Sequence, residues 1–228
     1  SNDGRSEMTL RVVLEDESGE NLGEATFSVA GGITWNRYEA TIKAGRTTTT
    51  GSLAIYVEKV GRLYLDMVSL FPENTYLKKN GLRADIAGLL ADLKPKFMRF
   101  PGGCLVHDGS INAQDRDSLY RWKNTIGTLE ERPARRNNWG YNQTLGLGYY
   151  EYFCFCEDIG AKPVPVLPGG YDPHHQRITP MEEMQEWIDD ALDLIEFANG
   201  SHSSGWGKIR AAMGHREPFH LEYIAIGN

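Results

Sequence analysis

Three stretches of the sequence carry residues that could do chemistry, and each directly follows a short apolar run. They read "RFPGGCLVHDG", "VLPGGYDPHHQ" and "AIGN". Two of them contain Pro-Gly-Gly, which lets a backbone turn sharply and approach a ligand closely. By itself Pro-Gly-Gly indicates only a tight turn, so the neighbouring side chains must decide between a turn and a site.

The second stretch brings an acid and two histidines together, a combination that could bind a metal ion. The candidates are Asp172, His174 and His175, but adjacent histidines usually point apart in an extended loop and no third ligand is obvious. We therefore favour a solvated or substrate-facing loop. In the first stretch, His107 and Asp108 could form a base and its orienting carboxylate, although such a pair in a loop more often lies on the surface.

The remaining candidates are a thiol, several aromatic rings and a charged run. Cys104 could be a nucleophile, but without an assured activating histidine a buried, hydrogen-bonded thiol is expected. Four aromatic residues could form a platform for a sugar, although each could equally belong to the core: Trp122, Trp139, Tyr141 and Tyr149. The charged run predicts a solvated, salt-bridged loop; it consists of Glu130, Glu131, Arg132, Arg135 and Arg136.

Composition limits the classes of partner. The chain has 228 residues, 24% of them charged, and a net charge of -7. No block of five or more like charges occurs, and no apolar run approaches the roughly 18 residues of a membrane span, so we expect neither nucleic-acid binding through a basic face nor a membrane span. The three cysteines have no zinc spacing, and we expect no metal and no other cofactor.

The elements that must position these residues follow two patterns. Residues 8 to 72 alternate between apolar and polar, which is typical of an antiparallel β-sandwich, here jelly-roll-like. Strands are expected at 9–16, 24–30, 36–44, 51–59 and 62–71. Five strands are few for a closed sandwich, so we interpret residues 1–73 as part of a carbohydrate-binding-module-like domain.

From residue 80 the pattern changes to alternating helices and strands. Helices are expected at 80–94, 145–160 and 179–200, alternating with strands at 95–100, 162–167 and 220–228. Such an order predicts parallel strands with right-handed crossovers. Because a (β/α)8 TIM barrel needs roughly 250 residues, we interpret residues 74–228 as the N-terminal half of a barrel, cut after a strand.

Two of these helices carry further expectations. The first should bury a face of leucine and isoleucine side chains: Leu82, Ile86, Leu89, Leu90 and Leu93. The last should begin at Thr179 as N-cap, with Pro180 in the first position and Glu182 completing a capping box.

Longer motifs make the resemblance to a known family specific. They include "NGLRADIAGLLADLKPKFMRFPGGC", "WKNTIGTLEERP", "NNWGYNQTLGLGYYEYFCFCEDIGAKPVPVL" and "WGKIRAAMGHREPFHLEYIAIGN". On these motifs the chain resembles the glycoside hydrolase family 51 α-L-arabinofuranosidases, in the branch with a carbohydrate-binding-like sandwich inserted early in the barrel. It departs from many members at Cys104, where they carry Asn, and in "LPGGYDPHHQ".

The resemblance implies roles for individual residues. In the family the fourth barrel strand ends Gly-Asn-Glu, and that Glu is the general acid/base. By this resemblance the acid/base follows Asn228 immediately and the nucleophile lies further downstream, so this chain holds no catalytic residue. Asn228 would hydrogen-bond the arabinose, Cys104 would touch the furanose, Trp139 would wall the pocket and Arg99 would orient the nucleophile. Arg99 could also, or instead, form a buried ion pair that holds the barrel together.

Three functions remain in competition. The first is a retaining hydrolase that removes terminal non-reducing α-L-arabinofuranosyl residues from arabinose-containing polysaccharides and oligosaccharides, with these 228 residues inactive alone. The alternative is a non-catalytic carbohydrate-binding module with a barrel scaffold. The third is a metal-dependent enzyme that uses His174 and His175. Expected partners are arabinose-containing glycans, together with self-association or the rest of the parent chain. A secreted or periplasmic location is favoured.

Overall fold

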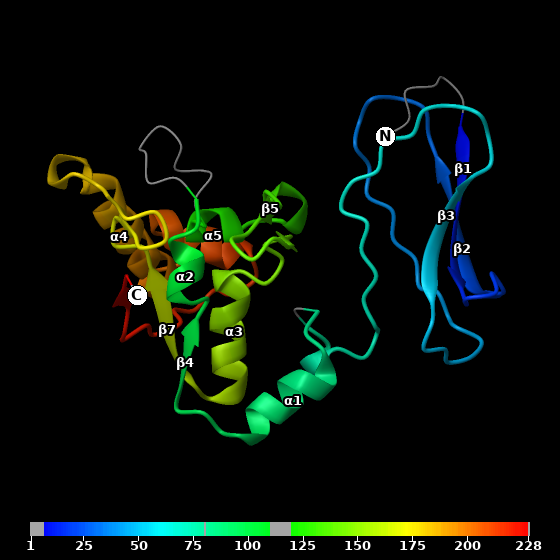
Figure 1. Ribbon diagram of the computed structural model, residues 1–228. Helices are drawn as coiled ribbons and strands as arrows, with labels where there is room; N and C mark the ends of the chain where they lie inside the picture. Colours follow the sequence, from blue (N-terminus) through cyan, green and yellow to red (C-terminus); the bar gives the residue numbers. More distant parts are fainter. Residues whose placement is uncertain (1–6, 80, 110–119, 228) are drawn as a thin grey trace. The chain divides into compact units, whose positions relative to one another are not determined.

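The computed structural model describes residues 7–79, 81–109 and 120–227. The chain forms two compact units, Ser1–Val68 and Ser69–Asn228, which we call the N-terminal and the C-terminal unit (Figure 1). Among the described residues, no helix is long and apolar enough to cross a membrane.

The N-terminal unit contains one antiparallel sheet with the strand order β2-β1-β3. Its strands are β1 (Met8–Glu15), β2 (Asn21–Val29) and β3 (Ser52–Val57). The turn between β1 and β2 is closed by Asp16, whose carboxylate accepts the backbone N–H groups of Ser18 at 2.8 Å and Glu20 at 3.0 Å. Met8, Leu10 and Val13 are the buried residues of β1, so the central strand supplies most of this small core.

Two of the five expected strands are wrong. The described chain has no strand at 36–44 or 62–71, although both segments alternate. Tyr38, Tyr64 and Leu65 are exposed, so the alternation there does not mark a buried face. A strand needs regular pairing of its backbone N–H and C=O groups, and the described residues of these two segments form no such ladder. What the structure supports is a three-stranded antiparallel sheet.

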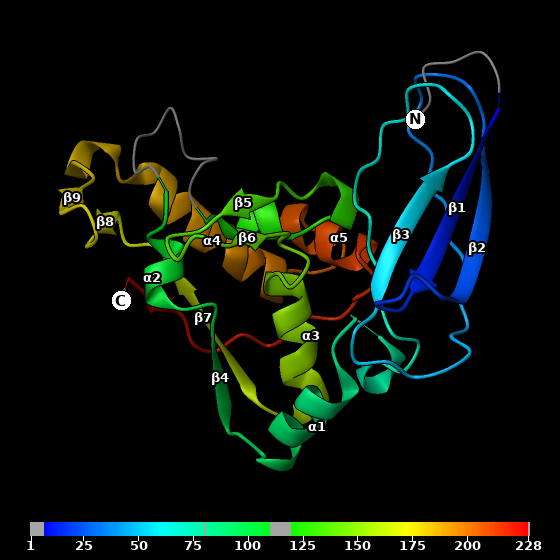
Figure 2. The ribbon, with the colours of Figure 1, turned by 45° about the vertical axis from the view of Figure 1, so that its right-hand side comes forward.

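The C-terminal unit is built around a parallel sheet with the order β10-β7-β4, flanked by helices (Figure 2). Its sheet strands are β4 (Phe97–Phe100), β7 (Lys162–Leu167) and β10 (Ala225–Ile226). Its α-helices are α1 (Ala84–Asp92), α2 (Gly103–Val106), α3 (Tyr149–Ile159), α4 (Gln185–Asn199) and α5 (Gly205–Ala212). Two-stranded pairs join β5 (Arg135–Arg136) to β6 (Asn142–Gln143) and β8 (Tyr171–Asp172) to β9 (Arg177–Ile178). Single 3-10 turns are η1 (Tyr76–Lys78), η3 (Trp122–Thr125), η4 (Leu129–Glu131) and η5 (Met181–Glu183).

The register of the parallel strands fixes where their exits lie. Phe100 pairs with Pro165, and Ile226 pairs with Leu167. The ladder continues one step further, because Gly227 N–H donates to the Leu167 carbonyl at 2.7 Å. The three carboxyl ends therefore meet at one edge of the sheet, as expected from the alternation of strands and helices.

Helix α3 packs its aromatic residues on this sheet. Phe100 of β4 contacts Tyr149, Tyr152 and Phe153 with ring centroids 4.6–5.6 Å apart. The helix ends at Gly160 in the left-handed conformation, with φ 68°, which only glycine adopts readily. The predicted end of this helix is confirmed. Strand β7 begins two residues after Gly160, at Lys162.

The expected N-terminus of the last long helix is wrong. Helix α4 begins at Gln185, preceded by η5, and Thr179 caps neither of them. Thr179 is buried and its backbone N–H donates to the Gly170 carbonyl at 2.7 Å. Thr179 therefore belongs to the loop after β7, and the N-cap positions of η5 and α4 are Pro180 and Met184.

The apolar face expected on α1 is largely exposed within the C-terminal unit. Ile86, Leu89 and Leu93 have exposed fractions of 49%, 68% and 76%, whereas Ala87 is buried. The helix forms as predicted, but among the described residues of its unit the larger side chains have little cover.

Helix α5 was not anticipated, and one of its residues organises the end of α4. Arg210 is fully buried, and its guanidinium group donates to backbone carbonyls. The five bonds, with lengths of 2.7–3.2 Å, go to Phe197, Ala198, Gly200, His215 and Arg216. Three of these carbonyls belong to the last turn of α4, where helical partners are missing. Arg210 therefore acts as a side-chain cap for α4.

Candidate active site

Two hollows lie where the parallel strands end. The first hollow, about 380 Å³, is lined by Arg99, Pro101, Gly102, Gly103, Cys104, Leu105, Trp139, Tyr141 and Gln143. The second hollow, about 350 Å³, is lined by His107, Gly169, Tyr171, Pro173, Ile226 and Gly227. Side chains at the carboxyl ends of parallel strands are where α/β proteins bind ligands. Both hollows are thus candidates for ligand binding.

The first hollow brings together three residues singled out in the sequence. Arg99 comes from β4, Cys104 from the turn after it, and Trp139 from the loop between β5 and β6. Cys104 is half-buried rather than buried, so the expectation of a buried thiol is wrong. Arg99 is exposed, which disfavours a purely structural, buried ion pair within this unit. Asn228 lies outside the described residues.

An aromatic pair forms one wall of the first hollow. Trp139 and Tyr141 stack with ring centroids 6.2 Å apart and an interplanar angle of 17°, and both are more than half exposed. Asn137 holds their backbone, because its side-chain oxygen accepts the N–H groups of Trp139 at 3.1 Å and Tyr141 at 3.3 Å. Flat exposed rings of this kind bind the apolar face of a sugar. Sequence reasoning missed Asn137, although "NNWG" is a typical turn signal.

The other two candidate aromatics belong to the core. Trp122 is buried and donates its indole N–H to the Asp190 carbonyl at 2.9 Å. Tyr149 is fully buried, and its hydroxyl donates to the Val166 carbonyl. Neither ring reaches a hollow, so neither is part of a sugar platform.

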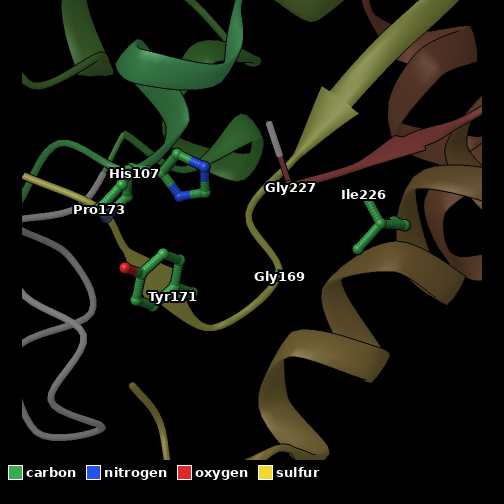
Figure 3. Close-up of a pocket in the computed structure, with 6 residues that line it drawn as sticks. All are labelled: His107, Gly169, Tyr171, Pro173, Ile226 and Gly227. Atoms are coloured by element: carbon green, nitrogen blue, oxygen red, sulfur yellow. The ribbon is translucent and has the colours of Figure 1, made fainter. Parts of the chain in front are cut away.

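His107 and Asp108 are buried, contrary to the expectation of a surface pair. Burial lowers the pKa of His107 and raises the pKa of Asp108. Asp108 forms an ion pair with Arg135, whose Nη2 lies 2.8 Å from Oδ2. His107 lines the second hollow together with Tyr171 (Figure 3). The two side chains therefore serve different partners and do not form a base with its orienting carboxylate.

Asp172 is the centre of a closed network in the loop after β7. Its carboxylate is fully buried and accepts the backbone N–H of His174 at 3.0 Å, the ring of His175 at 2.7 Å and Arg177 at 2.6 Å. Burial alone raises the pKa of Asp172, but the bonds from Arg177 and His175 outweigh it and lower the pKa to about 2. The described residues contain no group of three His, Cys, Asp or Glu side chains that could hold a metal ion. The Asp172 carboxylate therefore accepts hydrogen bonds from residues of its own loop and stabilises the conformation of that loop.

The charged run expected in solvent includes a buried residue. Arg132 is buried and forms a two-point pair with Glu151, with bonds of 2.9 and 2.8 Å. Glu151 also accepts the Gly148 backbone N–H at 2.9 Å at the start of α3. A side chain at Gly148 would lie 1.9 Å from the Thr125 carbonyl. Arg132 turns inward because Glu151 and the backbone carbonyls of Leu145 and Gly127 accept its N–H groups.

A parallel sheet with two hollows at its carboxyl edge, one of them walled by stacked aromatic rings, has the organisation of an α/β enzyme domain. Comparison with known proteins identifies the family. Residues 89–228 match the family described as "Alpha-L-arabinofuranosidase 1 domain". The chain therefore belongs to the glycoside hydrolase family 51 α-L-arabinofuranosidases.

Individual relatives agree with this assignment. The chain is 47% identical to an extracellular exo-α-L-arabinofuranosidase of Streptomyces chartreusis, over 98% of this chain and 28% of the relative. It is 40% identical to α-L-arabinofuranosidase 1 of Arabidopsis thaliana, over 97% of this chain and 32% of the relative. An arabinose-bound family 51 α-L-arabinofuranosidase structure superposes with a TM-score of 0.87 and 30% identity, covering all of this chain and 37% of that one. The chain thus spans about a third of the length of these relatives.

Proposed function

We propose that the full-length protein containing this chain is a retaining glycoside hydrolase. It would remove terminal non-reducing α-L-arabinofuranosyl residues from arabinose-containing polysaccharides and oligosaccharides. The observation that carries the proposal is the meeting of Arg99, Cys104 and Trp139 around one hollow at the carboxyl edge of the parallel sheet. The names of the relatives and the arabinose-bound neighbour support it.

In this proposal the first hollow binds the arabinose. Retaining hydrolysis uses two carboxylates about 5 Å apart, one to protonate the leaving oxygen and one to attack the anomeric carbon. Both carboxylates are proposed to lie beyond Asn228. The chain's own residues position the sugar: the Trp139 ring walls the pocket, Cys104 touches the furanose and Asn228 bonds a ring hydroxyl. Arg99, a permanent cation, orients the nucleophile carboxylate and keeps it ionised.

The finer fold assignment belongs to the same proposal. The parallel strands β4, β7 and β10 would be successive strands of a (β/α)8 barrel comprising residues 74–228 and later elements. Residues 1–73 would be part of a jelly-roll-like sandwich of the carbohydrate-binding type. The extracellular relative supports a secreted protein, and arabinose-containing glycans are the proposed partners. Either self-association or the remainder of the protein would cover the exposed face of α1.

The test is hydrolysis of an aryl α-L-arabinofuranoside by the full-length protein, with the anomer of the first product followed by NMR. We expect turnover with retention of the anomeric configuration. Arg99→Gln should lower kcat by on the order of 100-fold, the loss typical of one preorganised electrostatic contact. Arg83→Gln, at another exposed arginine that pairs with Asp85 at 2.6 Å, is the matched control and should leave kcat unchanged.

Three outcomes would contradict the proposal: inversion of configuration, equal effects of the two arginine changes, or binding of arabinoside without turnover. The last outcome would favour the carbohydrate-binding alternative. Loss of activity on chelation of metal ions, restored by adding them back, would favour the metal-dependent alternative through His174 and His175.

A further inference from the structure

The aromatic wall of the first hollow is carried by a short hairpin, residues 135–143, which we call the aromatic hairpin. Strand β5 pairs with β6 within it, and Asn137 closes its turn by accepting the N–H groups of Trp139 and Tyr141. These contacts fix the two rings relative to the backbone of the hairpin. The position of the rings relative to Cys104, which lines the same hollow, must be set by a contact outside the turn.

That contact lies at the base of the hairpin, between Arg135 and Asp108. Nη2 of Arg135 lies 2.8 Å from Oδ2 of Asp108 in an ion pair, and Nη1 donates to the backbone carbonyl of Asp108 at 3.3 Å. The N–H of Asp108 in turn donates to the carbonyl of Leu105 at 3.1 Å. Leu105 and Cys104 belong to α2 and line the first hollow. The ion pair therefore joins two elements that line this hollow.

Burial makes the ion pair restrictive. The side chains of Asp108 and Arg135 are 9% and 15% exposed. Burial raises the pKa of Asp108, and the positive charge of Arg135 opposes that shift. A buried charge that loses its partner costs far more than an exposed one. A shift of the aromatic hairpin away from α2 would separate the two charges, so the ion pair restricts the hairpin to one position.

We propose that Asp108 is a positioning residue for arabinose binding, because its pair with Arg135 holds the aromatic hairpin, and with it the Trp139 ring, in place at the first hollow. This inference rests on the proposed function, and neither Asp108 nor Arg135 touches the sugar in it. A ring that packs on the face of the sugar binds the substrate and the transition state alike. Loss of such an interaction raises KM and leaves kcat unchanged.

The experiment measures KM and kcat on a nitrophenyl α-L-arabinofuranoside with the full-length protein, and the inhibition constant of L-arabinose. Arg135→Gln removes the cation at the base of the hairpin. It should raise KM and the inhibition constant about tenfold, the order expected when one aromatic contact is lost, and leave kcat within about twofold. Asp108→Asn should have the same effect.

A double-mutant cycle with Trp139→Ala distinguishes positioning of the ring from a general loss of stability. Trp139→Ala alone should raise the inhibition constant about tenfold. Adding Arg135→Gln should then change it less than twofold, because the ring that the ion pair positions is already gone. Arg121→Gln is the matched control: Arg121 pairs with Asp190, with side chains 22% and 5% exposed, and lines neither hollow. It should lower Tm and leave KM and the inhibition constant unchanged.

Independent effects of Arg135→Gln and Trp139→Ala, an unchanged inhibition constant in Arg135→Gln, or a loss confined to kcat would overturn the inference while leaving the proposed function intact. If Arg135→Gln or Asp108→Asn does not fold, as judged by circular dichroism, Arg135→Lys keeps the cation and decides in the same cycle. A wild-type protein that does not cleave the nitrophenyl substrate would overturn the proposed function and this inference with it.

Discussion

Replacing Arg210 by methionine should be among the most destabilising single changes in the C-terminal unit. Methionine replaces the aliphatic part of the arginine side chain, but it cannot donate the five hydrogen bonds to backbone carbonyls. One of these carbonyls, that of Ala198, keeps a second donor in the Phe219 N–H at 2.8 Å. All five carbonyls lose the bond from Arg210, but Ala198 keeps its second donor, so at about 1 kcal/mol for each of the other four the cost is about 4 kcal/mol.

Thermal unfolding followed by tryptophan fluorescence can measure this cost. Trp122 is a local reporter because it contacts Phe197 at the end of α4 and Trp206 in α5. For a unit of this size 1 kcal/mol corresponds to about 2–4 °C in Tm, so we expect a fall of about 8–16 °C. Arg210→Lys should recover less than half of the loss, because an ammonium group cannot reproduce the planar fork of guanidinium.

The control is Arg83→Met, at an exposed arginine paired with an exposed aspartate. A surface pair of this kind is worth about 0–1 kcal/mol, so its Tm should change little. The reasoning would be refuted if Arg210→Met and Arg83→Met had the same Tm, since the carbonyls of α4 would then need no partner.

Three further predictions use other described contacts. Arg132→Met should cost about 3–5 kcal/mol by leaving a buried carboxylate unpaired, and adding Glu151→Met should cost less than the sum of the two single changes; additive urea midpoints would contradict this. Under native conditions at pH 8 iodoacetamide should label only Cys104, because burial raises the pKa of both α3 thiols to about 12; peptide mapping that finds labelled α3 thiols would show that the helix opens. Because its folded pKa is lowered to about 2, Asp172 stabilises the fold above its unfolded pKa of about 3.9 and loses that contribution as pH falls toward 2. Asp172→Asn should flatten Tm against pH in that window, and an unchanged slope would count against it.

The sequence predicted the elements whose signals are local and strong. Helix α3 ends at Gly160 as expected, because a glycine at that position terminates a helix whatever surrounds it. Strand β7 was predicted from its short run of apolar residues. The exits of β4 and β7 followed from strand order alone, and the exit of β4 led to Cys104, whereas Arg99 was named only through the resemblance to the family.

Features that depend on distant residues were not predictable. The capping-box pattern at Thr179 was overridden by a bond to Gly170, which only the folded loop provides. Arg132 lies in a run of charged residues, and nothing in that run indicates that Arg132 forms a buried ion pair with Glu151. His107 and Asp108 are adjacent in sequence, yet Asp108 pairs with a residue 27 positions away. Local patterns identify helices and turns, but burial of a charge depends on its partner.

The network around Asp172 has a consequence for how enzymes of this family can diversify. The segment from Tyr171 to Ile178 closes on itself through the β8–β9 pair and the bonds of Asp172 to His175 and Arg177. A segment whose conformation is held mainly by its own hydrogen bonds can be exchanged with few changes outside it, here chiefly at the Gly109 carbonyl that accepts from Arg177 at 3.2 Å. Under the proposed function, grafting a homologous loop of different length should therefore change which glycans are bound while Arg99 and Trp139 stay in place. Under the proposed function, mutations in this segment could change which glycans bind, while the residues of the arabinose pocket stay the same.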